Sequence, residues 1–547
     1  MLASFLLASA LGGEHVRHAL LGELSAVGSD HHSGLPFPRV FMGDEKRHLR
    51  AVLAVESSGE GYRINWRNVD HATPRDVIAL TCGDRPSWPL NEAFDAVAAT
   101  GAPSGAVELP ALPDLRCNYI ARYIVSSDED AAGEIAAELQ LPVKSLPLYP
   151  KQIHLSFTSG TRDEMLVIWT SAHADPAPTA RWGLEPHNLT HSVTGTSATY
   201  AASDMCNAPA NESGPLKFVD PGQIHRVLLT GLPLAANRSR AKVFYSVGQG
   251  ADVAGFSPVS SFRARSAPDA DAVKFIMYAD QSLPFDVLGP AWHLPAEVVH
   301  DINAGFDGFL LHPGDLGYAM GSGLQWDLYM ELIAPIASRV AYHVSVGNHE
   351  FDYDWNAAGG SDPSGDQPGG WHPGREDNGT WGNWGDDSQG ECGVPTSARF
   401  NGTGTAARLA GSDDGSNGIY WYSFDEGGVH VVMMSSEHDW RNGSVQQSWV
   451  ERDLAAVNRT ATPWIVLATH RMMYTTQLLE AGDYAVSLAL RAHCEHLLRR
   501  YKGESMLCTV TLHYYISRKS CSTTFKQFDS LPLLTICARY FRGTKLI

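Results

Sequence analysis

Short apolar runs alternate with clusters of turn-forming residues from Ile153 to about Ala264. Gly, Pro, Asn and Ser separate the runs, and several runs alternate apolar and polar positions, as half-buried strands do. The predicted strands are 152–158, 164–171, 190–201, 224–232 and 241–248. Short strands at this spacing are typical of an antiparallel sandwich. We therefore predict a fibronectin-III-like β-sandwich over residues 147–265, serving either as a spacer or as a binding module.

The pattern changes at Asp271, where apolar strands begin to alternate with helical segments. The predicted strands are 274–280, 308–315, 339–350, 429–439 and 463–470, and the predicted helices between them include 295–305 and 324–338. Such alternation indicates βαβ units, which form a largely parallel sheet covered by helices. Ser444 and Gln447 are spaced as a capping box and predict a further helix start, with Val445 and Trp449 on one face. We predict an α/β domain over 271–504.

The other segments carry weaker patterns. Residues 1–12 form an apolar run that ends in small residues, which predicts a signal peptide or else an ordinary apolar N-terminus. Residues 13–146 show no single hydrophobic periodicity, and the sequence does not indicate their function. Residues 355–390 are rich in Gly, Trp and Asp and predict a long surface insertion or a lid. Residues 505–547 form an atypical basic tail that contains cysteines.

Composition narrows the class of protein. The 547 residues are 44% hydrophobic and 18% charged, which indicates a folded chain of several domains. The formal charge of −19 argues against nucleic acid as a partner, because phosphate backbones attract basic surfaces. It does not exclude an anionic substrate, since bound metal ions reverse the local field. No run of 18 apolar residues is present, so we expect no membrane span.

Together with the apolar N-terminal run, two further features favour the secretory pathway. The eight cysteines form an even number and contain no CxxC pair, which suits disulfides better than zinc. Seven asparagines open N-glycosylation sequons, namely Asn188, Asn211, Asn237, Asn378, Asn401, Asn442 and Asn458. We expect a secreted, extracellular or vacuolar glycoprotein; the alternative is a cytosolic enzyme whose sequons arose by chance.

Metal-capable residues follow the ends of several predicted strands. Asp280 and His470 each end an apolar strand, Asp315 follows the next strand after Asp280, and Asn348 and His349 follow another. Sites in open α/β sheets lie at the carboxyl ends of strands, so these residues can meet although they are far apart in sequence.

The residue types suit two metal ions. Such a pair needs a bridging carboxylate and further ligands on each side. Asp315 is the candidate bridge, Asp280 is placed to serve one ion, and Asn348 and His470 are placed to serve the other. Tyr318 adds a phenolate, a hard ligand suited to ferric iron; its alternative role is a packed aromatic side chain.

These motifs resemble a known family. The segments that contain Asp280, Gly-Asp315-Leu-Gly-Tyr318, Gly-Asn348-His349-Glu and Ala-Thr-His470-Arg are similar to four of the five metal-site motifs of purple acid phosphatases. The resemblance covers about 147–504 and is to larger plant-type members with an extra N-terminal region. It implies a multidomain fold in which a fibronectin-III-like β-sandwich precedes a four-layer α/β metallophosphoesterase domain.

The resemblance also implies an activity. Family members hydrolyse phosphate monoesters at acidic pH, by attack of a metal-bound hydroxide at a dinuclear site of Fe(III) and a second divalent metal, Zn, Mn or Fe. It assigns iron to Asp280, Asp315 and Tyr318, and the second metal to Asp315, Asn348 and His470. His349 would act beside the metals as the catalytic acid or phosphate contact, and Arg471 as a weaker substrate contact. The expected partner is a small phosphate ester.

The fifth motif, Gly-His-x-His, is missing. The family-like sequence ends near Glu504, and residues 505–547 hold six basic residues against one acidic residue. The tail has three interpretations. It is an artefact of the gene model, it belongs to an isoform with a damaged metal site, or it supplies His513 and another residue in place of the missing histidine pair. His493 and His496 are spaced like ligands but fall on a predicted surface helix.

Two rival functions remain from the sequence. A phosphodiesterase or nucleotide pyrophosphatase would use the same metal residues with different pocket loops. An inactive binding protein would use the β-sandwich while the metal site, without its last motif, stays incomplete. The absent His-x-His is the feature that separates this second rival from an enzyme.

Overall fold

The computed structural model describes most of residues 51–141 and 149–501, together with the short strands at 523–524 and 535–538. The main gaps are 83–94, 110–118, 126–133, 284–293, 355–384 apart from Ser364, 401–414 and 475–480. The chain divides into two compact units, 1–146 and 147–547. No helix in the described part is both long and apolar enough to cross a membrane. The proposed signal peptide at 1–12 lies outside the described residues.

The first unit is built of antiparallel strands, an architecture that the mixed sequence pattern did not predict. Its two sheets have the orders β1-β2-β5 and β4-β3-β6-β7. The strands are β1 Val52–Ser58, β2 Gly61–Arg67, β3 Val77–Cys82, β4 Asp95–Ala98, β5 Gly105–Leu109, β6 Tyr119–Val125 and β7 Glu134–Gln140. Buried Asp76 accepts a hydrogen bond of 2.9 Å from the hydroxyl of Tyr123.

The second unit begins with the predicted sandwich. Two four-stranded antiparallel sheets have the orders β11-β10-β14-β15 and β12-β13-β9-β8. The strands are β8 Lys151–Ser156, β9 Met165–Ser171, β10 Pro178–Gly183, β11 His191–Thr194, β12 Thr196–Ala198, β13 Gln223–Leu229, β14 Lys242–Gln249 and β15 Ser260–Arg263. The sequence pattern missed β10 and β15.

The prediction of one continuous strand over residues 190–201 was wrong. Residues 190–201 form two strands that lie in different sheets, because β11 pairs with β10 while β12 pairs with β13. Gly195 stands between them, and a side chain there would collide with the carbonyl oxygen of Arg226. The glycine therefore permits the chain to pass from one sheet to the other.

The α/β domain contains the expected parallel sheet, and together with the sandwich it confirms the predicted fold class. Its sheets have the orders β18-β17-β16-β23-β22 and β19-β20-β21. The strands are β16 Phe275–Met277, β17 Phe309–Pro313, β18 Tyr342–Ser345, β19 Tyr422–Glu426, β20 Val429–Met433, β21 Trp464–Ala468, β22 Thr523–Thr524 and β23 Thr535–Ala538. The sequence pattern did not predict β19.

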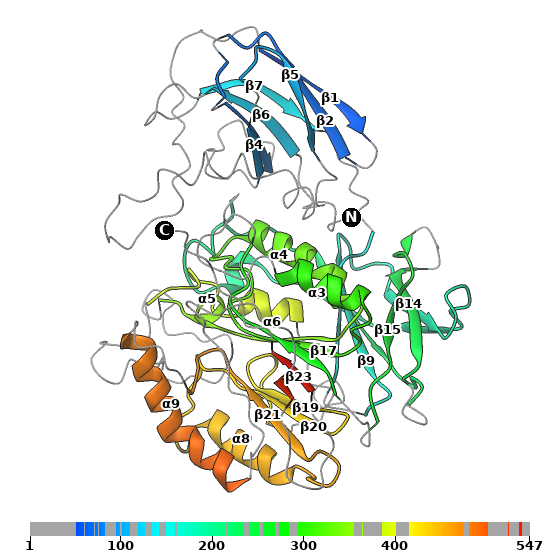
Figure 1. Cartoon of the computed structure of the whole chain (residues 1–547), viewed down its shortest axis with the longest axis vertical. Coiled ribbons are helices and arrows are strands. Elements are labelled where there is room, and N and C mark those ends of the chain that lie inside the picture. The colour runs from blue at the N-terminus through cyan, green and yellow to red at the C-terminus, as the bar shows by residue number, and fades with distance from the viewer. Residues whose placement is uncertain are drawn as a thin grey trace. The chain divides into compact units, whose positions relative to one another are not determined.

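Helices cover both sides of these sheets. They are α3 Leu294–Asn303, α4 Gly323–Ala337, α5 Asn348–Phe351, α6 Val394–Phe400, α8 Val445–Ala456 and α9 Ala481–Arg500. Figure 1 shows α3 and α4 on one side of the strands and α8 and α9 on the other. The predicted cap of α8 is confirmed, since the Ser444 hydroxyl accepts from the Gln447 amide. Trp449 is buried, but Val445 is 56% exposed, so the prediction that the two side chains share one apolar face was wrong.

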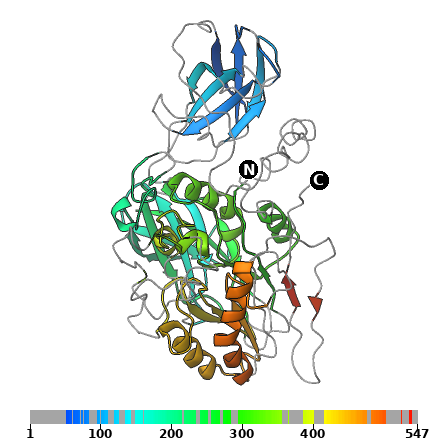
Figure 2. The same cartoon turned by 90° about the vertical axis from the view of Figure 1, so that its left-hand side faces the viewer.

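The basic tail contributes a strand to the core sheet. β23 runs parallel to β16, with Ile276 beside Cys537 and Met277 beside Ala538. β22 pairs antiparallel with β23 (Figure 2, in red). The outer edge of β16, which leads toward Asp280, is therefore paired through its backbone.

The sandwich and the α/β domain share one core. A single cluster of buried apolar side chains runs from the sandwich through strands of both α/β sheets. Buried polar groups cross the same boundary: Gln152 of β8 donates to Asp327 at 2.9 Å and accepts from Arg399 at 2.9 Å, and Arg265 pairs with Glu426 at 3.5 Å. These paired charges are costly to separate, which favours one fixed arrangement of the two parts.

A buried histidine ties β19, β20 and α8 together. His430 on β20 contacts Asp425 of β19 at 2.7 Å and Asp453 of α8 at 2.8 Å. Burial acts to lower the pKa of His430, but the two carboxylates outweigh it and raise the pKa to about 9. The protonated ring therefore stabilises the fold fully below about pH 6.5, and this contribution is lost as the pH rises through 9.

We expect His430→Gln to lower the free energy of unfolding by roughly 3 kcal/mol at pH 6 and by much less at pH 10. Urea denaturation of wild type and variant at both pH values measures the difference. His300→Gln is the matched control, because that side chain is 83% exposed. An equal loss of unfolding free energy at both pH values would contradict a stabilising role for the charge on His430.

Candidate metal centre

Three predicted ligands meet at the carboxyl ends of parallel strands. Asp280 lies just beyond β16, Asp315 just beyond β17 and His470 just beyond β21. One ligand atom from each lies within 4.8 Å of the others. All three residues are buried, at 2%, 3% and 0% exposure. The structure thus brings together residues that are 190 positions apart in sequence.

The remaining predicted residues surround this group. The Tyr318 hydroxyl donates to Asp280 Oδ1 at 3.2 Å. Asn348 begins α5, and its Oδ1 lies 3.0 Å from His470 Nε2. The backbone N–H of His349 donates to Asp315 Oδ1 at 3.3 Å, and its ring packs 4.4 Å from the Tyr318 ring. All six side chains named for metals and catalysis therefore lie in one place.

The backbone of the site is unusual. Asp280, Asp315 and Tyr318 have φ angles of 55°, 51° and 48°, in the left-handed region that side chains other than Gly rarely adopt. Ser282 and Met320 in the same two loops share this conformation, with φ of 62° and 46°. Such strain tends to gather where a site needs side chains aimed in one direction.

Glu350 holds the two ligand loops together, a role that the sequence did not assign. This buried carboxylate accepts backbone N–H bonds from Asp315 at 2.7 Å, from Leu316 at 2.8 Å and from Gly347 at 2.9 Å. It therefore joins the loop after β17 to the loop after β18. Glu350 is the last residue of the Gly-Asn-His-Glu motif. The spacing of that motif does not indicate which backbone amides Glu350 binds.

Electrostatics at the site favour bound cations. Burial acts to raise the pKa of Asp315, but His470, His349 and the Tyr318 hydrogen bond together hold it below its usual value. Burial and the neighbouring carboxylates of Asp315 and Asp280 raise the pKa of Tyr318 well above its usual value. A phenolate at Tyr318 therefore requires a strong positive charge beside it.

The donor set fits metal ions. Two buried carboxylates and a buried imidazole converge, with a phenol and an amide oxygen beside them, and burying such groups together is costly unless a cation compensates them. Carboxylate, phenolate and imidazole donors also match the preferences of iron, zinc and manganese. The residues present therefore suit metal binding.

Two other polar residues have definite partners at the site. The Arg471 Nε donates to Glu437 at 2.9 and 3.1 Å, and Arg471 Nη2 lies 3.8 Å from Asp352. Its guanidinium thus packs among carboxylates. Asp387 accepts from Asn348 Nδ2 at 2.8 Å, although it ends the stretch predicted as a surface insertion or a lid. That stretch showed no periodicity, so sequence alone gave no signal for Asp387.

The other candidate residues lie elsewhere. His493 and His496 are on α9, as predicted, and the His493 ring accepts from the Asn442 amide. His513 falls outside the described residues. The sequons at Asn188, Asn211, Asn442 and Asn458 are exposed, while Asn237, Asn378 and Asn401 are not described.

We expect Gly347→Ala to damage the centre. A Cβ at this position would collide with Asp315 Oδ1 and lie 2.9 Å from His470 Cδ2. The two ligands must move, so metal affinity should fall about tenfold or more, with a stability loss of about 1–3 kcal/mol. Equilibrium dialysis against Zn(II) measures the affinity. Gly255→Ala is the control, because a Cβ there meets only an atom at 3.7 Å; equal affinities in both variants would refute the prediction.

Comparison with known proteins agrees with this architecture. Residues 150–264 match the family described as the purple acid phosphatase N-terminal domain, and residues 292–502 match the calcineurin-like phosphoesterases. A purple acid phosphatase from yellow lupin seeds has a similar fold, with a TM-score of 0.62 at 23% identity over 81% of this chain and 75% of that one. The fold is that of a metallophosphoesterase preceded by a β-sandwich.

Sequence relatives narrow the class to a family. The "Probable inactive purple acid phosphatase 9" of Arabidopsis thaliana is 31% identical over 474 residues, which are 81% of this chain and 67% of the relative. A "Nucleotide pyrophosphatase/phosphodiesterase" of Hordeum vulgare is 31% identical over 164 residues, 30% of this chain and 36% of that relative. The chain belongs to the purple acid phosphatase family, which confirms the resemblance found in its motifs.

Proposed function

We propose that this protein hydrolyses small phosphate monoesters at acidic pH at a dinuclear site of Fe(III) and a second divalent metal. The observation that carries the proposal is the meeting of Asp280, Asp315 and His470, whose ligand atoms lie within 4.8 Å of one another. Membership of a phosphoesterase family supports the same reaction type.

In this proposal Asp280, Asp315 and Tyr318 hold iron, while Asp315, Asn348 and His470 hold Zn, Mn or Fe. Two such ions, when bound, supply Lewis-acid stabilisation of the phosphate oxygens and activation of the attacking water. Asp315 is the only one of these residues assigned to both ions. The backbone N–H of Asp315 is held by Glu350, which fixes the loop that carries this carboxylate.

His349 is the proposed catalytic residue. Its Nε2 lies 4.0 Å from Asp315 Oδ2, and 19% of the side chain is exposed, so the ring reaches both the metal ligands and the solvent side. A histidine in this place can donate a proton to a leaving oxygen or a hydrogen bond to the phosphoryl group. We assign Arg471 to fixing the neighbouring Glu437 and Asp352 rather than to the substrate.

The first experiment is elemental analysis of the purified 547-residue chain, followed by assay with a phosphate monoester from pH 4 to pH 8. About two metals per chain, one of them iron, together with turnover on the acidic side, would support the proposal. A chain that carries no metal would contradict it, and the named ligands would then be remnants of the family site.

A phosphodiesterase is the second candidate, and the barley relative is the observation that favours it. Assaying a monoester and a bis-ester on the same preparation separates the two activities. Absence of bis-ester cleavage would remove this candidate, while preference for the bis-ester would replace the proposed substrate class.

An inactive binding protein is the third candidate. It is favoured by the missing Gly-His-x-His in the sequence and by a relative whose name calls it inactive. Replacing residues 505–547 with a family-type C-terminus that carries this motif tests it. A gain of turnover would mean that the tail limits the site, whereas no gain would count against the enzyme proposal itself.

We further propose that the chain passes through the secretory pathway. The exposed sequons and the disulfide between Cys206 and Cys392 support this location. Expression in a secretory host and treatment with an endoglycosidase provide the test. A mobility shift supports the proposal, and retention of an unglycosylated protein in the cytosol contradicts it.

A further inference from the structure

Asn348 lies between two groups that need opposite ends of its amide. Its Nδ2 donates to Asp387 Oδ2 at 2.8 Å, and its Oδ1 lies 3.0 Å from His470 Nε2. The Asp387 oxygen accepts this hydrogen bond, so Asp387 selects the nitrogen end of the amide. The oxygen end then faces His470, whose Nε2 also lies 3.3 Å from Asp315 Oδ1.

The loop that carries Asp387 is fixed by backbone hydrogen bonds made just after this residue. The Ser388 amide donates to the Asp352 carbonyl at 2.8 Å, and the Gly393 amide donates to the Glu350 carbonyl at 2.8 Å. Both acceptors lie directly after or within α5, the helix that begins at Asn348. The loop and the metal-binding turn therefore form one hydrogen-bonded unit.

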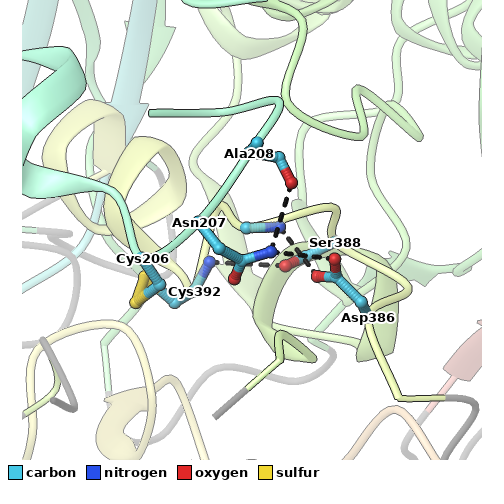
Figure 3. The surroundings of a disulfide bond; sticks show 7 residues. Cys206, Asn207, Ala208, Asp386, Ser388 and Cys392 are labelled. Atoms are coloured by element: carbon cyan, nitrogen blue, oxygen red, sulfur yellow. Dashed lines mark hydrogen bonds between the residues drawn. A yellow bond between two sulfur atoms is a disulfide. The ribbon is translucent and has the colours of Figure 1, made fainter. Parts of the chain in front are cut away.

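The same loop is attached to the β-sandwich. Figure 3 shows the disulfide between Cys206 and Cys392, with Asp386 accepting from Asn207 Nδ2 at 2.9 Å. Asp386 also accepts from the Gly390 amide at 2.9 Å. Two neighbouring carboxylates thus have different tasks: Asp386 faces the disulfide side, and Asp387 faces Asn348.

We propose that Asp387 is a positioning residue that sets the orientation of the Asn348 amide and so presents Asn348 Oδ1 to the second metal. The inference rests on the proposed function, because it takes Asn348 as a metal ligand. Partners that orient a ligand commonly change metal affinity by about 10- to 100-fold. Without Asp387 the amide is free to turn, and its nitrogen cannot serve as a ligand.

The test compares three variants of the full chain. Asp387→Ala removes the acceptor, Asp387→Asn keeps a carbonyl oxygen able to accept from Asn348, and Asp386→Ala removes the neighbouring carboxylate without touching Asn348. Calorimetric titration with Zn(II) reports the affinity, and elemental analysis reports the iron content of the same samples.

We expect Asp387→Ala to weaken Zn(II) binding about 10- to 100-fold with the iron content unchanged, and Asp387→Asn to restore most of the loss. Asp386→Ala should keep wild-type affinity even if its melting temperature falls. Wild-type affinity in Asp387→Ala, or the same loss in Asp386→Ala, would overturn the inference.

A wild-type chain that binds no Zn(II) would contradict the proposed function. The orientation of the Asn348 amide would then be tested with crystal structures of the metal-free proteins. In that case Asn348 Oδ1 should turn away from His470 in Asp387→Ala and stay in place in Asp387→Asn. An unchanged Asn348 in Asp387→Ala would overturn the positioning role by itself.

Discussion

Asp315→Ala is expected to abolish metal binding at the centre, because in the proposed site it is the one described residue assigned to both ions. The side chain lies 3.3 Å from His470 Nε2 and is 3% exposed, so water cannot replace it with the same geometry. Metal affinity should fall by more than about a hundredfold, and hydrolysis should fall with it.

Elemental analysis and a phosphate-monoester assay on the same preparation measure both effects of Asp315→Ala. Asp307→Ala serves as the control, since that carboxylate contacts Lys274 at the surface and is 39% exposed. Thermal unfolding of the metal-free proteins shows whether the variants remain folded. A folded Asp315→Ala protein with two bound metals and normal turnover would contradict the two-metal proposal.

The second large effect is expected from Cys206→Ser combined with Cys392→Ser. The disulfide joins residues 186 positions apart, and removing so long a cross-link costs up to about 5 kcal/mol by the chain-entropy model, more often 2–4 kcal/mol. Because the loop that leads into Cys392 also carries Asp387, the double variant should lose metal affinity together with stability.

Urea denaturation of the double variant, and of wild type with and without reductant, measures the stability change. Reduced wild type should unfold at the midpoint of the double variant. Cys494→Ala provides the control for loss of a buried cysteine, since Cys494 is free and buried. If the double variant unfolds at the midpoint of oxidised wild type, the loop does not depend on the disulfide.

The sequence predicted the parts of the fold that have strong periodicity. The meeting of Asp280, Asp315 and His470 was predicted from the apolar strands that precede them, because parallel strands deliver their ends to one edge. Strand β10 was missed since it begins at Pro178, a residue type that usually interrupts regular structure. Strand β19 was missed because it ends in Asp425 and Glu426, residue types that are depleted in strands.

The residues that support the metal ligands could not be predicted from the sequence, for a different reason. Glu350 acts through three backbone amides, and Asp387 acts through one side-chain amide. Neither partner is indicated by residue type or spacing, since every residue except proline offers a backbone N–H and many side chains can donate to a carboxylate. Such roles depend on how loops fold back on each other, and only coordinates give that information.

The pairing of β23 with β16 bears on how the chain avoids aggregation. A central strand left without a neighbour would expose a row of N–H and C=O groups able to recruit a strand from another molecule. The tail pairs with this edge along Ile276 and Met277. Backbone pairing imposes few demands on residue type, so a sequence unlike the family's usual C-terminus can still cover this edge of β16.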